Sequence, residues 1–160
     1  MSTSGESVEE PTREGDMASD PSGERKPTRQ GTEALSKAFA GQLRNVTDAR
    51  LTAEGYLASL ARASPPSTVE HWDDILLVVT ELVANSVQYA PGPFELHMRR
   101  TFDGVHVTVR DSSTTPPAPR PFHPRQGGGG IGWHLIHTLC DQVSVELRPD
   151  GKDVHTFLPW

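Results

Sequence analysis

The spacing of the apolar residues changes at Pro91-Gly92-Pro93, and this change constrains the fold of the 160-residue chain more than any other feature. Before it lies a stretch without proline or glycine, in which apolar residues recur at the intervals of a helix: Trp72, Leu76, Val79, Val83 and Val87. After it, apolar and polar residues alternate as in half-buried strands: Phe94, Leu96, Met98, Val105, Val107 and Val109. The Asp103-Gly104 pair between these two groups of strand residues is typical of a hairpin turn. The sequence therefore predicts a long helix, over about residues 67–90, followed by two antiparallel strands.

The rest of the chain adds shorter elements of the same two kinds. Helical spacing predicts a helix over Asp48–Ala61 and a short helix around Leu135–Leu139. Alternating residues predict strands over Val143–Leu147 and Val154–Leu158, joined by a turn at Asp150-Gly151. Because helices come first and most strands later, the predicted fold class is α+β with a mostly antiparallel sheet.

Residues 1–30 differ in composition from the rest of the chain. They contain seven acidic and four basic residues and no Leu, Ile, Phe, Tyr or Trp. Such a segment cannot bury enough apolar surface to offset the entropy of ordering it. It is therefore predicted to be a disordered acidic tail, with one domain over residues 31–160. A solubilising extension is the simplest interpretation of the tail, and a regulatory arm is the alternative.

Composition also sets expectations about the compartment and the partners. The single cysteine, Cys140, has no partner for a disulfide within the chain. No apolar run approaches the roughly 20 residues of a membrane span, and the N-terminus lacks the apolar core of a signal peptide. The expected location is therefore the cytoplasm, without membrane contact. The formal net charge of −6 argues against unspecific binding to nucleic acid.

Three polar side chains recur at four-residue intervals on one face of the long predicted helix: Glu81, Asn85 and Tyr89. Glu81 and Asn85 interrupt an otherwise apolar segment, where a buried polar group needs a partner. They form either a solvated helix face or a site in which Asn85 offers an amide oxygen to Mg²⁺ and Glu81 acts on a water or hydroxyl. The residues alone leave both interpretations open.

Two further segments carry candidate ligand-binding groups. Asp111 ends the valine-rich strand, where a carboxylate either accepts a hydrogen bond from a ligand amine or caps a turn. Glycines at positions 127–130 and 132 lead into the short predicted helix, whose first backbone amides favour phosphate. The match to a dinucleotide-binding motif is weak because no strand immediately precedes the glycines, and a flexible linker is the alternative.

Taken together, these segments resemble the GHKL nucleotide-binding fold of gyrase, heat-shock chaperones, histidine kinases and mismatch-repair ATPases. Within it, the chain is most similar to the small actinobacterial anti-sigma-factor serine kinases. Glu81–Tyr89 resembles the N-box of that family, Val109–Asp111 its adenine-contact segment, and Gly130–Leu135 its G-x-G-L-x-L lid motif. Gly151–Val154 resembles its last hairpin. The resemblance covers about residues 45–158 and implies the Bergerat fold, a two-layer α/β sandwich with helices on one face of a mostly antiparallel mixed sheet.

The resemblance also implies a role for each site residue. Asn85 would coordinate a Mg²⁺ ion that bridges the phosphates of ATP, Glu81 would be the general base, and Asp111 would bind the adenine amino group. Backbone room and amides for the phosphates would come from the lid residues Gly130, Ile131 and Gly132. The implied activity is transfer of the γ-phosphoryl group to a serine of an anti-sigma-factor antagonist. The implied partners are that antagonist, a sigma factor and a second copy of the chain.

The chain departs from the family pattern in three places. Tyr89 stands where the family usually has His, Ser112–Thr115 follow Asp111 where the wider superfamily has glycines, and five prolines lie in the lid segment. None of these departures removes the expected Mg²⁺ or adenine residue. The alternative to a kinase is a catalytically weak module that holds a sigma factor or an antagonist in a nucleotide-dependent manner. The ATPase half of a two-component histidine kinase is a weaker alternative, because the chain has little room for a dimerising helix pair.

Overall fold

The computed structural model describes residues 34–118 and 131–160. The predicted tail over residues 1–30, the predicted domain boundary at residue 31 and the predicted lid residue Gly130 lie outside the described residues. All three therefore stay predictions.

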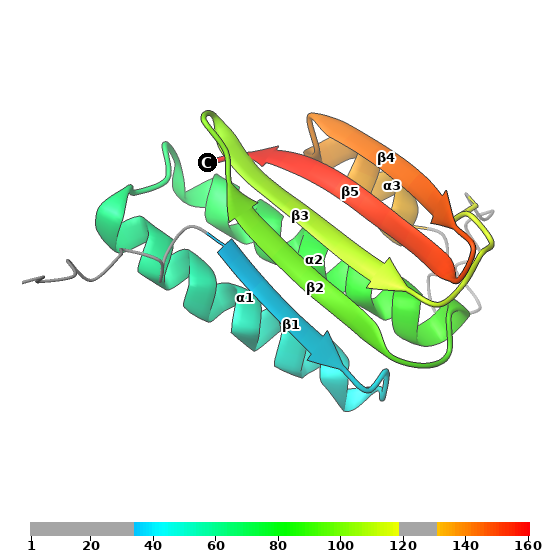
Figure 1. The fold of residues 1–160 in the computed structure, drawn as a ribbon. Coiled ribbons are helices and arrows are strands. Elements are labelled where there is room, and N and C mark those ends of the chain that lie inside the picture. Colours follow the sequence, from blue (N-terminus) through cyan, green and yellow to red (C-terminus); the bar gives the residue numbers. More distant parts are fainter. Residues whose placement is uncertain (1–33, 119–130) are drawn as a thin grey trace, which may run out of the picture.

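Five strands form one sheet in the order β1-β2-β3-β5-β4, and each of the pairings between described strands is antiparallel (Figure 1). The elements follow one another along the chain as β1 (Ala34–Phe39), α1 (Arg44–Ala63), α2 (Val69–Tyr89), β2 (Phe94–Arg100), β3 (Gly104–Asp111), α3 (Ile131–Leu139), β4 (Gln142–Arg148) and β5 (Gly151–Pro159). The turns predicted at Asp103-Gly104 and Asp150-Gly151 join β2 to β3 and β4 to β5.

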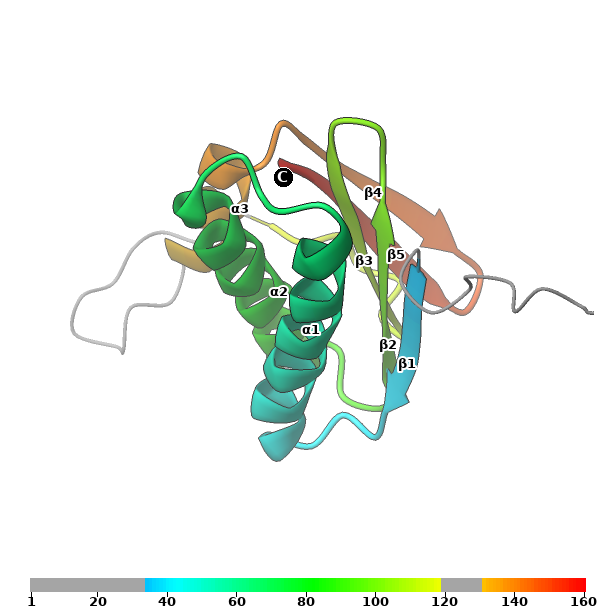
Figure 2. The ribbon, with the colours of Figure 1, turned by 90° about the vertical axis from the view of Figure 1, so that its left-hand side faces the viewer.

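The three helices of the described residues, α1, α2 and α3, lie on the same side of the sheet, and no described helix covers its other face (Figure 2). The alternation of residues in β3 explains this arrangement. Val105, Val107 and Val109 face the helices and are at most 1% exposed, whereas His106 and Arg110 alternate with them and face away. The predicted α+β fold, with two layers and helices on one face, is confirmed.

The predicted apolar stripe of the long helix faces the core between the two layers. Leu76, Val79 and Val83 are buried, and Trp72 and Val87 pack half-buried at the ends of the stripe. Each fully buried side chain of this size stabilises the fold by about 1.5–3 kcal/mol relative to exposure. α2 is thereby held against β3 and β5. Neither α2 nor any other helix in the described ranges is long and apolar enough to cross a membrane.

The first two elements differ from the sequence expectation. β1 was not expected as a strand because Phe39 is its only buried residue, which is a pattern that an edge strand with one covered end produces. α1 begins at Arg44, four residues before the predicted start. The backbone amide of Gln42 donates to Oδ1 of Asn45 at 2.8 Å, so polar contacts form the first turn, and apolar periodicity does not reveal them.

Cys140 follows α3 and is packed half-buried against the core. Burial raises the pKa of its thiol to about 12, and a hydrogen bond with Thr156 offsets only part of this effect. The thiol is therefore protonated at neutral pH.

Candidate functional site

The end of β3, the start of β5 and helix α2 meet at one end of the sheet, and Asp111 lies at this junction (Figure 1). Asp111 is the last residue of β3 and pairs in register with Lys152, the second residue of β5. Its side chain follows the inward alternation of the β3 valines and is 3% exposed. The predicted strand-end carboxylate is thus buried between the sheet and the helices.

Three donors bind the carboxylate of Asp111. The ammonium group of Lys152 and the backbone amide of Ser113 each donate to Oδ1 at 2.9 Å, and the hydroxyl of Ser86 donates to Oδ2 at 3.1 Å. The bond from Ser113 caps the turn after β3. Turn capping was one of the two roles that the sequence left open for Asp111. The other two bonds come from β5 and α2, so Asp111 also joins three elements of the site.

Lys152 was not among the predicted site residues. Its position directly after the Asp150-Gly151 turn could have indicated a place in the site, because this position sets Lys152 opposite the end of β3. A side chain added at Gly151 would collide with the backbone oxygen of Asp111, so this glycine allows the two strands to approach closely here.

Ser86 connects helix α2, which carries Glu81 and Asn85, to the end of β3. It directly follows Asn85, and it is buried because it lies on the side of α2 that faces β3. Asn85 itself is half-buried, and no hydrogen bond of its side chain is formed with residues 34–118 or 131–160. Asn85 thus neighbours Ser86 along α2, and its amide has no hydrogen-bond partner in the described part of the chain.

Glu81 lies one helical turn before Asn85 and faces the start of α3. A side chain added at Gly132, the second residue of α3, would collide with the carboxylate of Glu81. Burial raises the pKa of Glu81 above its ordinary value of 4.5. A carboxylate with a raised pKa accepts a proton more readily at neutral pH, as a general base requires.

Two further predicted residues are more exposed. Ile131, the first residue of α3, is 48% exposed, and Tyr89, at the end of α2, is 39% exposed. The structure therefore brings together Glu81 with Gly132 and, through Ser86, the Asn85 region of α2 with Asp111.

A protein-family model for the histidine kinase-like ATPase domain matches residues 39–156. The chain belongs to this family. The solved structure of the RsbU and RsbW domains of Rv1364c from Mycobacterium tuberculosis has a TM-score of 0.56 at 15% identity, with 80% of this chain covered. This chain spans 32% of the length of that one, and the likeness establishes the fold alone.

This histidine kinase-like ATPase domain was also compared with a second solved structure and with curated proteins. The histidine kinase domain of a blue-light activated histidine kinase from Erythrobacter litoralis matches with a TM-score of 0.42 at 22% identity, over 67% of this chain and 60% of that one. A search of curated proteins gave no match.

The described site of this ATPase domain offers suitable groups for a magnesium nucleotide. A buried carboxylate, Asp111, accepts hydrogen bonds, and the amide oxygen of Asn85 is a hard ligand of the kind that Mg²⁺ prefers. One protein ligand is enough for Mg²⁺ when waters and substrate phosphates supply the others. Gly132 leaves no room for a side chain between α3 and Glu81, which keeps the helix start close to α2.

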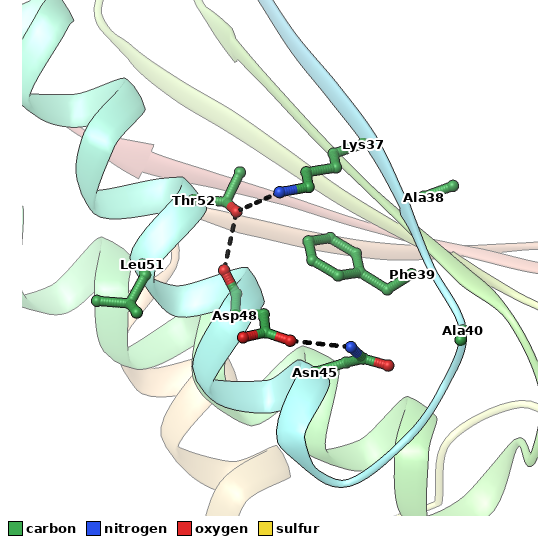
Figure 3. Close-up of a pocket in the computed structure, with 8 residues that line it drawn as sticks. All are labelled: Lys37, Ala38, Phe39, Ala40, Asn45, Asp48, Leu51 and Thr52. Atoms are coloured by element: carbon green, nitrogen blue, oxygen red, sulfur yellow. Dashed lines mark hydrogen bonds between the residues drawn. The ribbon is translucent and has the colours of Figure 1, made fainter.

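A hollow of about 540 Å³ lies at the opposite edge of the sheet, between β1 and α1 (Figure 3). Lys37, Phe39, Asn45, Asp48 and Thr52 are among its lining residues. Four of these form two hydrogen bonds with one another: Lys37 donates to Thr52, and the Asn45 amide donates to Asp48 at 3.0 Å (Figure 3). The polar groups of this hollow thus bind one another, and the hollow contains none of the predicted site residues.

The outer face of the sheet carries a second polar cluster. Glu146, Asp153 and His155 have ligand atoms within 4.8 Å of one another, which is a spacing compatible with a metal. The carboxylate of Asp153, however, is bound by Arg110 through two hydrogen bonds, and Nε of Arg148 lies 2.9 Å from it without hydrogen-bond alignment. Two guanidinium groups disfavour a cation here, so this cluster is an ion-pair network.

Proposed function

We propose that this histidine kinase-like ATPase domain is an ATP-dependent protein-serine kinase that phosphorylates a serine of an anti-sigma-factor antagonist in the cytoplasm. The observation that carries the proposal is the hydrogen bond from Ser86 to Asp111, 3.1 Å long. It joins the helix that bears Glu81 and Asn85 to the strand end that bears the buried carboxylate. This contact between segments far apart in the sequence supports a shared site for Asn85 and Asp111, as the family resemblance implies.

Each residue has one role in this proposal. Asp111 accepts a hydrogen bond from the amino group of adenine, and Asn85 supplies one oxygen to Mg²⁺, which neutralises phosphate charge when it is bound. The backbone at the start of α3 faces the phosphates, with contributions from Gly130, Ile131 and Gly132. Asn85 and Asp111 together fix the nucleotide at both of its ends.

Glu81 acts on the phosphoacceptor. It takes the proton from the serine hydroxyl of the antagonist while the serine oxygen forms a bond to the γ-phosphorus. The bond from that phosphorus to the bridging oxygen of ADP breaks, and ADP leaves with the electron pair. The raised pKa of Glu81 supports this role, because it makes the carboxylate a better proton acceptor.

A second candidate function is nucleotide-dependent binding of a sigma factor or antagonist without phosphoryl transfer, by one copy or a dimer. The packing of the Glu81 carboxylate against Gly132 favours it, since a base in that position has to move before it reaches a serine hydroxyl.

Calorimetric titration with ATP, with and without Mg²⁺, tests the binding site. Micromolar affinity is expected for the unaltered chain, which corresponds to about −8 kcal/mol at 1 μM. Asn85→Ala should remove the effect of Mg²⁺. Asp103→Asn, which changes an exposed acid at the far end of β3, should leave binding unaltered. Absence of heat with every adenine nucleotide would reject the site.

Labelled-phosphate transfer separates the two functions. The chain is incubated with ATP, Mg²⁺ and candidate antagonists from its host. A kinase labels a serine, and Glu81→Gln loses the transfer but keeps ATP binding. Retained partner binding with no transfer by the unaltered chain supports the second function.

A further inference from the structure

Lys152 is an ionisable residue inside the site that the proposed function leaves without a role. Its side chain is 7% exposed, and its ammonium group donates to Oδ1 of Asp111 at 2.9 Å. A buried ammonium is costly unless it is paired and hydrogen-bonded, and Asp111 supplies this pairing.

The donors and acceptors of this pair are not fully used. An ionised carboxylate offers about four acceptor positions, of which Lys152, Ser113 and Ser86 occupy three, so Oδ2 of Asp111 keeps one. An ammonium group has three N–H donors, and Asp111 takes one of them. No other hydrogen bond of Lys152 is formed within the part of the chain that the structure describes. One free acceptor and two free donors therefore lie side by side in a buried place.

We infer that Lys152 is a specificity-determining residue that reads the nucleobase together with Asp111. The pair presents an acceptor next to a donor, which complements a base edge that offers a donor next to an acceptor. On adenine, these are the 6-amino group and the neighbouring ring nitrogen N1. Asp111 accepts from the amino group and Lys152 donates to N1. This inference rests on the proposed function, because it takes Asp111 to be the base-binding residue.

The pairing also specifies which bases the site rejects. A 6-oxo purine such as hypoxanthine has a carbonyl in place of the amino group and an N–H at position 1. It therefore sets an acceptor against Asp111 and a donor against Lys152, and each contact becomes unfavourable. A site built from two fixed polar groups rejects such a mismatched base strongly, because its own groups are left unpaired.

The experiment removes the donor from the protein and the acceptor from the ligand. Affinities for ATP and 1-deaza-ATP, in which a C–H replaces N1, are measured by calorimetry for the unaltered chain, Lys152→Met and Lys152→Arg. The unaltered chain should bind ATP about tenfold more tightly than 1-deaza-ATP, because a hydrogen bond from a charged donor is lost. Lys152→Met should bind the two nucleotides equally, and Lys152→Arg should keep part of the preference.

Lys37→Met is the matched control, since it removes an exposed lysine at the opposite edge of the sheet. It should preserve the tenfold preference. Inosine triphosphate should bind the unaltered chain at least tenfold more weakly than ATP. Tighter binding of inosine triphosphate than of ATP overturns the adenine orientation.

The outcomes separate this inference from the proposed function. If the unaltered chain binds ATP and 1-deaza-ATP equally, or if Lys152→Met keeps the preference, Lys152 does not read the base although the ATP site stands. The first of these measurements needs no variant, so poor folding of Lys152→Met does not prevent the test. If the unaltered chain binds no adenine nucleotide, the proposed function itself is wrong.

Discussion

Two ion pairs occupy neighbouring register positions of β3 and β5, one on each face of the sheet. Asp111 and Lys152 pair on the inner face, and Arg110 and Asp153 pair directly beside them on the outer face. Both pairs join the same two strands, with nitrogen–oxygen distances of 2.9 and 2.8 Å, but the acid is on β3 in the inner pair and on β5 in the outer pair. Because successive residues of a strand point to opposite faces, one pair is sealed beneath α2 and the other faces away from all the helices.

The outer carboxylate lies between two guanidinium groups. Arg110 donates to both oxygens of Asp153, at 3.0 and 2.8 Å, and Arg148 adds a third cationic contact. Burial opposes ionisation of Asp153, but the hydrogen bonds and charge of Arg110 and the charge of Arg148 outweigh it, so the pKa of Asp153 is lowered.

The inner carboxylate pairs with one cation and lies in a more enclosed setting. A single ammonium, one hydroxyl and one amide bind Asp111, which leaves part of its hydrogen-bonding capacity for a ligand. Under the proposed function, the outer pair serves stability alone, whereas the inner pair also serves nucleotide recognition. Substitutions on each face of the sheet test this contrast.

Asp111→Asn should have the largest effect. It leaves the Lys152 ammonium buried without a counter-charge, which should cost about 3 kcal/mol of unfolding free energy. It should also weaken ATP binding by about 10- to 100-fold, because a charge-assisted acceptor is lost. Denaturant unfolding and calorimetry measure the two effects. A variant that lost stability but kept full ATP affinity would contradict a recognition role for the inner pair.

Asp153→Asn should affect stability alone. Removal of the outer carboxylate should cost about 2 kcal/mol at neutral pH, less than a fully buried pair because Arg110 is 44% exposed. A lowered folded pKa stabilises the fold above the ordinary aspartate pKa of 3.8 and ceases to do so as the pH falls through the folded value. The difference from the unaltered chain should therefore shrink as the pH falls below 3.8 and vanish below the folded pKa, with ATP affinity at neutral pH unchanged.

Gly132→Ala should disturb the contact between α3 and α2. The added methyl group meets the carboxylate of Glu81, so we expect a loss of about 1 kcal/mol of stability together with weaker ATP binding. The double variant Glu81→Ala, Gly132→Ala should recover the stability, because the clashing side chain is absent. If the two substitutions instead lower the melting temperature additively, Glu81 is not the side chain that clashes with the added methyl group.

Glu81→Gln should have the smallest effect on stability, and its sign depends on pH. A folded pKa above 4.5 means that ionising Glu81 opposes folding, so the cost is absent below pH 4.5 and grows as the pH rises through the folded pKa. The variant should therefore be more stable than the unaltered chain at pH 8 and equal to it at pH 4. Glu70→Gln, in which an exposed acid with a lowered pKa is removed from the same helix, should show no gain at pH 8.

The sequence was sufficient to predict α2 and the two hairpins because their signals are local. The stripe from Trp72 to Val87 and the turns at Asp103-Gly104 and Asp150-Gly151 need no distant partner to be recognised. β1 was missed because an edge strand with a single buried residue, Phe39, has little alternation to detect.

The candidate site shows the same division between local and distant information. Spacing along one helix placed Glu81 and Asn85 together, and the end of a valine-rich strand marked Asp111. The contacts of Asp111 with Lys152 and Ser86 join residues 41 and 25 positions apart, and only strand register and packing bring them together. A lysine after a turn has no sequence signature of burial, so its part in the site had to come from the structure.

The protonated state of Cys140 has a practical consequence for following ligands in solution. With a pKa near 12, only about one thiol in 10⁵ is ionised at pH 7, and maleimide dyes react with the thiolate. The native cysteine should thus remain unlabelled during a short incubation. Ser112→Cys, at an exposed position directly after Asp111, would then carry the fluorophore selectively and report nucleotide arrival without removal of the natural thiol.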